Sequence, residues 1–290
     1  MHPKNRHHNP YNLDALSNEL PELKKYLLTT KYGKKSIDFA NPKAVKYLNK
    51  ALLKKHYNIK YWDFPDKNLC PPIPGRVDYI YHLSDLIGNK KNIKILDIGT
   101  GATIIYALLG TAINNWKFVV SDIDKEALEN AKKIISKNNL KDKIEIRLQK
   151  NPLNILKGII NPNEQFTATM CNPPFYKSAE EAKQANLKKQ KGLHINSTKR
   201  NFSGTSNELW YNGGEKAFLH NYLYESSLYR ENSIWFTTLV SKKENVKSME
   251  ISLKKLGAKS IKIIPMHQGN KITRIVAWSF LDILQTKKTT

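Results

Sequence analysis

The sequence contains little cysteine and no long apolar segment. Its only cysteines, Cys70 and Cys171, form no CxxC pair and belong to no Cys/His cluster with metal-ligand spacing. We therefore expect no disulfide framework and no metal site, as is usual for a cytoplasmic protein. No run approaches the ~18 apolar residues of a membrane span, and no apolar segment typical of an export signal follows the first residues. We expect no membrane partner.

Acidic residues are scarce as well. Lys and Arg number 48 against 25 Asp and Glu, which gives a formal net charge of +23 and a pI of about 9.8. A Lys-rich composition can reflect an AT-rich genome, but an excess of this size favours an anionic partner.

The first 78 residues differ from the rest in pattern. Residues 1–20 are polar and basic, so we expect them to stay mobile until a partner orders them, with His7 and His8 solvated or near phosphate. Helical patterning follows at 21–28 and at 42–57. The segment 62–78 is too rich in proline for a helix, and we interpret it as a structured linker that closes over a ligand. We divide the chain into a basic, partly helical extension, 1–78, and a larger domain, 79–290.

Apolar strands and periodic helices alternate regularly through the larger domain. This alternation predicts an α/β fold with a parallel sheet, and the last two strands, which have no helix between them, should form an antiparallel hairpin at its edge. The expected strands are 93–98, 118–121, 144–148, 168–171, 233–239, 260–265 and 274–280, and the expected helices are 79–87, 102–113, 125–138, 214–229 and 244–256.

A glycine pair follows the first of these strands. Asp97 is near the strand end, and Gly99 and Gly101 allow a ligand to approach the backbone closely. Ile104 stands where a dinucleotide fingerprint needs a small residue, which disfavours a dinucleotide. Asp122 ends the next strand, where a carboxylate can accept both hydroxyls of a ribose.

Four residues, Asn172, Pro173, Pro174 and Phe175, follow the strand 168–171. The two prolines make a rigid turn that lacks two N–H donors, so it presents acceptors: the Asn172 side-chain oxygen and the Pro173 carbonyl. Acceptors suit an NH2 group, and Phe175 offers a face on which a base can stack. The turn predicts methyl transfer to an amine.

A long interruption, about 176–212, follows this turn. It is longer than an ordinary loop and therefore predicted to be functional. Its basic residues include Lys183, Lys188, Lys189, Lys191, Lys199 and Arg200. Basic loops beside an active site usually contact phosphates, although the segment could also be a solvated insertion.

Several segments together resemble one family across nearly the whole chain. They are HPKNRHH, SIDFANPKAVKYLNKALL, LCPPIPGRVDYIYHL, ILDIGTGATIIYALLG, CNPPF, ELWYNGGE and IVAWSF. The sequence is similar to the bacterial 23S ribosomal RNA adenine-N(6) methyltransferase F family, and to its eukaryotic relative that methylates small nuclear RNA.

The resemblance implies a seven-stranded, Rossmann-like class I methyltransferase sheet with helices on both faces. It also implies S-adenosylmethionine as the methyl donor and one adenosine of 23S rRNA, free or in a large-subunit assembly intermediate, as the substrate. Gly99, Gly101 and Thr103 would line the methionine side of the cofactor pocket, Asp122 would hold the ribose, and Arg76 would meet the cofactor carboxylate.

The remaining assignments extend these roles. The predicted cofactor residues also include Asp97 and Asn172. The predicted RNA contacts are Lys4, Arg6 and the basic residues of the interruption. We expect the protein to be a monomer. Four rival functions stay open: methylation of another structured RNA, methylation of DNA adenine, methylation of a protein glutamine, and RNA binding by an inactive assembly factor.

Overall fold

A computed structural model describes residues 1–178, 180–181, 184, 209–268 and 271–282. Within these ranges seven strands form one sheet in the order β5-β4-β3-β6-β7-β9-β8. The strands are β3 (Lys94–Ile98), β4 (Lys117–Asp122), β5 (Ile144–Leu148), β6 (Phe166–Cys171), β7 (Ser233–Val240), β8 (Ser260–Gln268) and β9 (Lys271–Ser279). The first five strands in this order, from β5 through β4, β3 and β6 to β7, run parallel. β9 is antiparallel to both β7 and β8. The predicted fold class and edge hairpin are confirmed.

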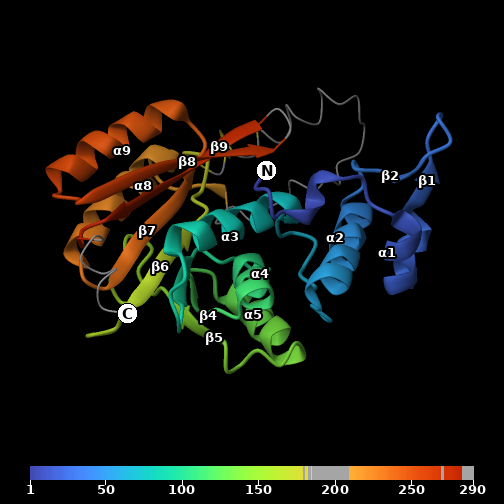
Figure 1. Cartoon of the computed structure of the whole chain (residues 1–290), viewed down its shortest axis with the longest axis horizontal. Coiled ribbons are helices and arrows are strands. Elements are labelled where there is room, and N and C mark those ends of the chain that lie inside the picture. The colour runs from blue at the N-terminus through green and yellow to red at the C-terminus, as the bar shows by residue number, and fades with distance from the viewer. Residues whose placement is uncertain (179, 182–183, 185–208, 269–270, 283–290) are drawn as a thin grey trace.

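Helices cover both faces of this sheet (Figure 1). One apolar cluster joins alternate strand residues such as Ile95 and Val120 to α3 (Ile73–Ile87), α4 (Ile105–Asn114) and α5 (Lys125–Lys137). A second cluster joins the intervening residues, such as Leu96 and Val119, to α8 (Gly214–Leu228) and α9 (Lys243–Lys255). Successive side chains of a strand point to opposite faces of the sheet, and here both sets are apolar. Both faces therefore need helices to cover them.

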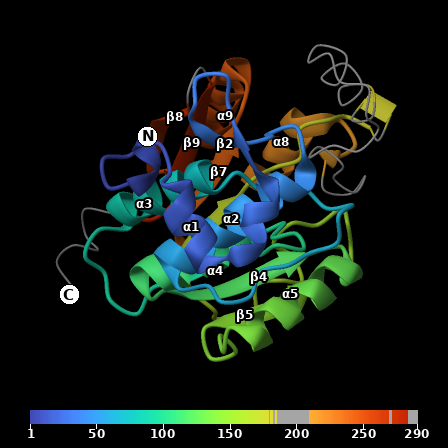
Figure 2. The ribbon, with the colours of Figure 1, turned by 90° about the vertical axis from the view of Figure 1, so that its right-hand side faces the viewer.

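The N-terminal extension has a small apolar core of its own. The core joins α1 (Leu13–Glu19), the 3-10 helix η2 (Pro21–Tyr26) and α2 (Pro42–Tyr57), and it includes Leu16, Leu23 and Leu48. An unexpected two-stranded sheet, β1 (Leu27–Thr29) and β2 (Lys35–Ile37), projects from it. Figure 2 shows α1 and α2 in front of α4. The helix predicted over 21–28 was therefore wrong in type and length, whereas α2 matches its prediction.

The prediction of a mobile first segment was wrong. The His2 amide donates to Asp78 Oδ1 over 2.6 Å, and Asn5 Nδ2 donates to Pro74 O and Asp78 Oδ1, each over 3.0 Å. His7, in the 3-10 helix η1 (Arg6–His8), is buried with its Nε2 2.8 Å from the Tyr57 hydroxyl. Burial lowers the pKa of His7 to about 4, so it is neither solvated nor a cation for phosphate. The buried Asp78 carboxylate needs these donors, which explains why a polar segment is ordered here.

The segment 62–78 was also mispredicted in part. α3 starts at Ile73, six residues before the expected helix. Pro74 is tolerated in its first turn because an N–H at that position would have no helical partner, so the lack of one costs no hydrogen bond. The predicted domain boundary between 78 and 79 falls inside this helix. No helix in the described ranges combines the length and the apolarity that a membrane crossing requires.

Candidate active site

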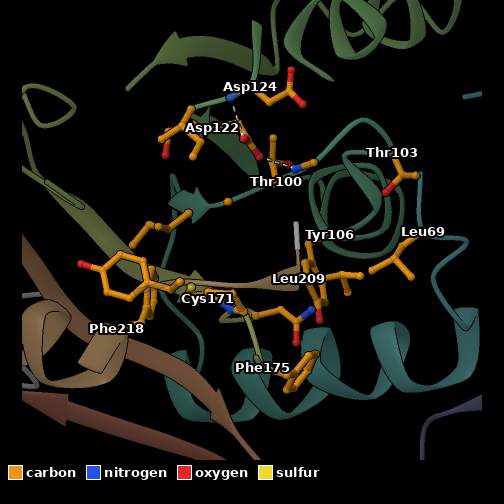
Figure 3. A pocket seen from close by; sticks show the side chains of 18 of the residues that line it. Leu69, Thr100, Thr103, Tyr106, Asp122, Asp124, Cys171, Phe175, Leu209 and Phe218 are labelled. Atoms are coloured by element: carbon orange, nitrogen blue, oxygen red, sulfur yellow. Dashed lines mark hydrogen bonds between the residues drawn. The ribbon is translucent and has the colours of Figure 1, made fainter. Parts of the chain in front are cut away.

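A cavity of about 430 Å³ opens at the carboxyl ends of β3, β4 and β6, where ligands of such sheets bind. Figure 3 shows Asp122 and Thr100 at one end and Phe175 with Leu209 at the other. Of the predicted site residues, the lining includes Arg76, Gly99, Gly101, Thr103, Asp122, Asn172, Pro174 and Phe175. The predicted residues from four separate chain segments therefore meet in one cavity.

The loop after β3 is shaped by its backbone. Gly99 and Gly101 have φ of +69° and +63°, a region that suits glycine, and the amides of Gly99 and Thr100 both donate to Ser121 O. Ile104 also has a positive φ, +41°, although it is β-branched and buried. Such strain is uncommon outside functional sites. It occurs at the position where the sequence departs from a dinucleotide fingerprint.

The two aspartates after β4 have different tasks. Asp122 Oδ2 accepts the Gly101 amide over 2.8 Å, which ties the ends of β3 and β4 together at the cavity. Asp124 is the N-cap of α5 and accepts the amides of Glu126 and Ala127. Asp122, at the strand end beside the glycine loop, therefore remains the residue predicted to hold a ribose.

Asp97 lies behind the cavity wall, 1% exposed, and accepts the Thr100 hydroxyl over 2.7 Å. Burial raises its pKa to about 7; the Thr100 hydrogen bond opposes this, and the Asp122 charge adds to it. From this place Asp97 would support the glycine loop rather than touch a ligand.

Arg76, in the first turn of α3, lines the cavity and donates through Nη1 to the Tyr106 hydroxyl over 3.0 Å.

The turn after β6 is held by a distant segment. Leu209 O accepts the amides of Phe175 and Tyr176 over 3.1 and 3.0 Å, and Tyr211 N donates to Tyr176 O over 3.0 Å. Pro173 is buried, Asn172 is half-buried, and Phe175 is 41% exposed, so its ring is open to a partner. Prolines cannot donate, so the amides that anchor this turn are those of the two residues that follow the prolines, Phe175 and Tyr176.

Other lining residues were not named as site residues from the sequence. They include Leu69 to Pro72, Tyr106, Gln149, Asn154, Ile155 and Leu209 to Tyr211. Leu69 to Pro72 belong to the segment 62–78, which was expected to close over a ligand. Ile155 is fixed by Glu225 of α8, whose buried carboxylate accepts the amides of Ile155, Leu156 and Lys157 over 2.7 to 2.9 Å. Leu69 to Pro72, Tyr106 and Leu209 to Tyr211 had a signal, since they lie in the segments LCPPIPGRVDYIYHL, ILDIGTGATIIYALLG and ELWYNGGE.

The predicted RNA contacts divide into two groups. Lys4 and Arg6 are exposed on the N-terminal segment, where Lys4 lies 3.6 Å from Asp85 and Arg6 Nη1 lies 3.2 Å from His56 Nδ1. The second group lies outside the described residues and consists of Lys183, Lys188, Lys189, Lys191, Lys199 and Arg200.

Over the part of the chain that the structure describes, no three His, Cys, Asp or Glu side chains are grouped so that they could hold a metal.

This sheet order and this site define a class I, Rossmann-like methyltransferase. The model of an RNA methyltransferase family matches residues 1–282, and the chain belongs to that family. Ribosomal RNA large subunit methyltransferase F of Flavobacterium johnsoniae is 48% identical, over 99% of this chain and 95% of that protein. The protein of the same name from Pseudoalteromonas translucida is 47% identical, over 97% of this chain and 93% of its own length.

Solved structures agree with this assignment. The human METTL16 catalytic domain in complex with MAT2A 3′UTR hairpin 1 superposes with a TM-score of 0.86 at 29% identity, covering 98% of this chain and 96% of that one. The N-terminal domain of human METTL16 in complex with SAH gives a TM-score of 0.78 at 27% identity over 97% and 99%. The predicted family and enzyme class are therefore confirmed: the chain is an rRNA methyltransferase.

Proposed function

We propose that this enzyme transfers the methyl group of S-adenosylmethionine to the exocyclic N6 amine of one adenosine in large-subunit rRNA, either free or within an assembly intermediate. The observation that carries this proposal is the Asn-Pro-Pro-Phe turn at the end of β6, of which Asn172, Pro174 and Phe175 line the same cavity as Asp122 and Arg76. The similar proteins named methyltransferase F support the RNA, and the SAH complex of a similar fold supports the cofactor class.

The donor set of the cavity fits S-adenosylmethionine. Arg76 is a cation for a carboxylate, Asp122 is an acceptor for a ribose diol, and the glycine loop lets a ligand lie against the backbone. When bound, this cofactor supplies an electrophilic methyl group on a sulfonium. Arg76 would hold the amino-acid end and Asp122 the ribose, which leaves the space beside Asn172 for the acceptor base.

The turn would act on the base through hydrogen bonds. The exocyclic amine of adenine is a poor nucleophile because its lone pair is delocalised into the ring. The Asn172 side-chain oxygen and the Pro173 carbonyl would each accept one amine proton, which favours a pyramidal nitrogen whose lone pair points at the methyl group. Phe175, with its exposed ring, would hold the base by stacking. Orientation and preorganised acceptors would then supply most of the acceleration.

Tritium transfer tests this proposal. Labelled S-adenosylmethionine would be incubated with unmodified large-subunit rRNA, as deproteinised RNA and as particles, and the RNA digested to nucleosides and separated. We expect label in 6-methyladenosine at one position. Label in protein would instead favour glutamine methylation, and label in a different nucleoside would refute the assigned amine.

The variant Asn172→Ala tests the role of the turn separately from cofactor binding. It should retain the cofactor dissociation constant within about threefold while turnover falls by at least 100-fold, of the order seen when a preorganised transition-state group is removed. Equal loss of cofactor binding and turnover would contradict the role assigned to Asn172.

A further inference from the structure

The pairing between β6 and β7 ends before the active-site turn. Phe166 pairs with Ser233 and Ala168 with Trp235, and within the described ranges the ladder goes no further, although both strands continue. β7 goes on pairing with β9 on its other side, up to Val240. The last three residues of β6 before Asn172 therefore need another support on this side.

Two buried threonine hydroxyls bridge the strands at that point. Thr237 Oγ1 donates to Thr169 O over 2.7 Å, and the Thr237 amide donates to Thr169 Oγ1 over 3.3 Å. Each threonine thus uses its side chain against the other's backbone, in place of an ordinary pair of backbone hydrogen bonds. Both residues are 0% exposed.

Two tyrosines extend this bridge to both layers of helices. Tyr79 of α3 lies with its hydroxyl 2.7 Å from Thr237 Oγ1, and since that hydroxyl already donates to Thr169 O, Tyr79 is the donor to it. On the other face, the Tyr222 hydroxyl of α8 hydrogen-bonds to Thr169 Oγ1. Both tyrosines are 0% exposed, so four hydroxyls, together with the Thr169 carbonyl and the Thr237 amide, form one network through the sheet from α3 to α8.

The bridge contributes to stability, because it satisfies the buried Thr169 carbonyl and the buried Thr237 amide. Stability does not require that these two groups be satisfied by side chains of the facing strand, since continued backbone pairing would do the same. A fully satisfied polar network does, however, fix one geometry in a core. The geometry fixed here lies three residues before Asn172, on a strand whose turn has two prolines and cannot anchor itself.

We propose that Thr169 and Thr237 are positioning residues for methyl transfer: their hydroxyls hold the carboxyl end of β6 at a set spacing from β7 and so place the Asn172 acceptor. This inference rests on the proposed role of Asn172. Tyr79 and Tyr222 fix the two hydroxyls in turn, one from each face.

Isosteric variants test the inference. Thr237→Val and Thr169→Val should lower the single-turnover rate of methyl transfer at least 10-fold, with the RNA KM and the cofactor dissociation constant within twofold of wild type. Thr237→Ser keeps the hydroxyl and should restore the rate to within threefold. If the valine variants do not fold, Tyr79→Phe and Tyr222→Phe, which each remove one outer hydroxyl, should lower the rate two- to fivefold.

Ser233→Ala is the control for a purely structural effect. Ser233 is buried at the paired end of β7, and its hydroxyl donates to Trp235 O over 2.8 Å. This variant should lower the melting temperature but leave the rate unchanged. The inference is overturned if the threonine variants lower stability as Ser233→Ala does while keeping the wild-type rate, or if they lose cofactor affinity in proportion to rate.

Asn172→Ala in the same series separates the two proposals. If Asn172→Ala keeps its rate, the proposed function fails. If Asn172→Ala is inactive and the valine variants, or the phenylalanine variants in their place, remain fully active, only the positioning inference fails.

Discussion

Asp97→Asn should flatten the pH dependence of stability. The buried Asp97 carboxyl has a pKa of about 7 in the folded chain, against about 3.9 when unfolded. Between these values the native state binds more protons than the unfolded state, so stability falls as pH rises. Over pH 5.0 to 7.5 this one group lowers the free energy of unfolding by about 2.5 kcal/mol. Asparagine does not titrate, and its oxygen still accepts the Thr100 hydroxyl.

Urea denaturation at pH 5.0 and 7.5 measures this difference. Wild type should lose about 2.5 kcal/mol more between the two pH values than Asp97→Asn does. Asp63→Asn is the control: partial burial raises the pKa of Asp63, but hydrogen bonds from Lys46 and Lys50 lower it overall, so Asp63 is ionised in both states over this range and its removal leaves the slope unchanged. Equal losses in wild type and Asp97→Asn would refute the reasoning.

Three further outcomes are expected. Phe175→Ala should lower kcat/KM for RNA by roughly 5- to 150-fold, the worth of one base stack of about 1 to 3 kcal/mol, and a tyrosine there should stay near wild type; an alanine variant with unchanged kcat/KM would exclude stacking. Gly110→Ala should destabilise the fold by about 1 to 3 kcal/mol in denaturation, because the added Cβ would overlap the Phe118 ring; unchanged stability would show that the ring can move. Lys4→Ala combined with Arg6→Ala should reduce the salt slope of RNA binding by roughly 1.5, and an unchanged slope would place the phosphates elsewhere.

Most of the sheet could be predicted from local pattern, since its strands are short apolar runs separated by periodic helices. β5 was predicted to the residue, and β3, β4 and β6 within two residues. Each site residue at a strand end followed from that, because parallel strands place their carboxyl ends at one edge. The sequence placed Asp122 at such an end, and in the structure Asp122 accepts the Gly101 amide there.

Two of the errors come from long-range hydrogen bonding. Nothing near His2 or Asn5 in the sequence indicates that Asp78 will accept hydrogen bonds from both. The early start of α3 was a different error, because prolines were weighed as helix breakers without regard to their place in the first turn. The segment ELWYNGGE includes Leu209, but the role of Leu209 could not be predicted from pattern, since its carbonyl, not its side chain, anchors the turn.

The position of β9 has a consequence for the order in which the chain folds. β9 lies between β7 and β8, although it follows both in the chain. A nascent chain that has emerged as far as β8 therefore still exposes the edge of β7, with its backbone N–H and C=O groups open to any other strand. Only when residues 271–279 emerge does that edge acquire its partner. Ribosomal stalling or truncation before Lys271 would thus release an aggregation-prone fragment rather than a partly active enzyme.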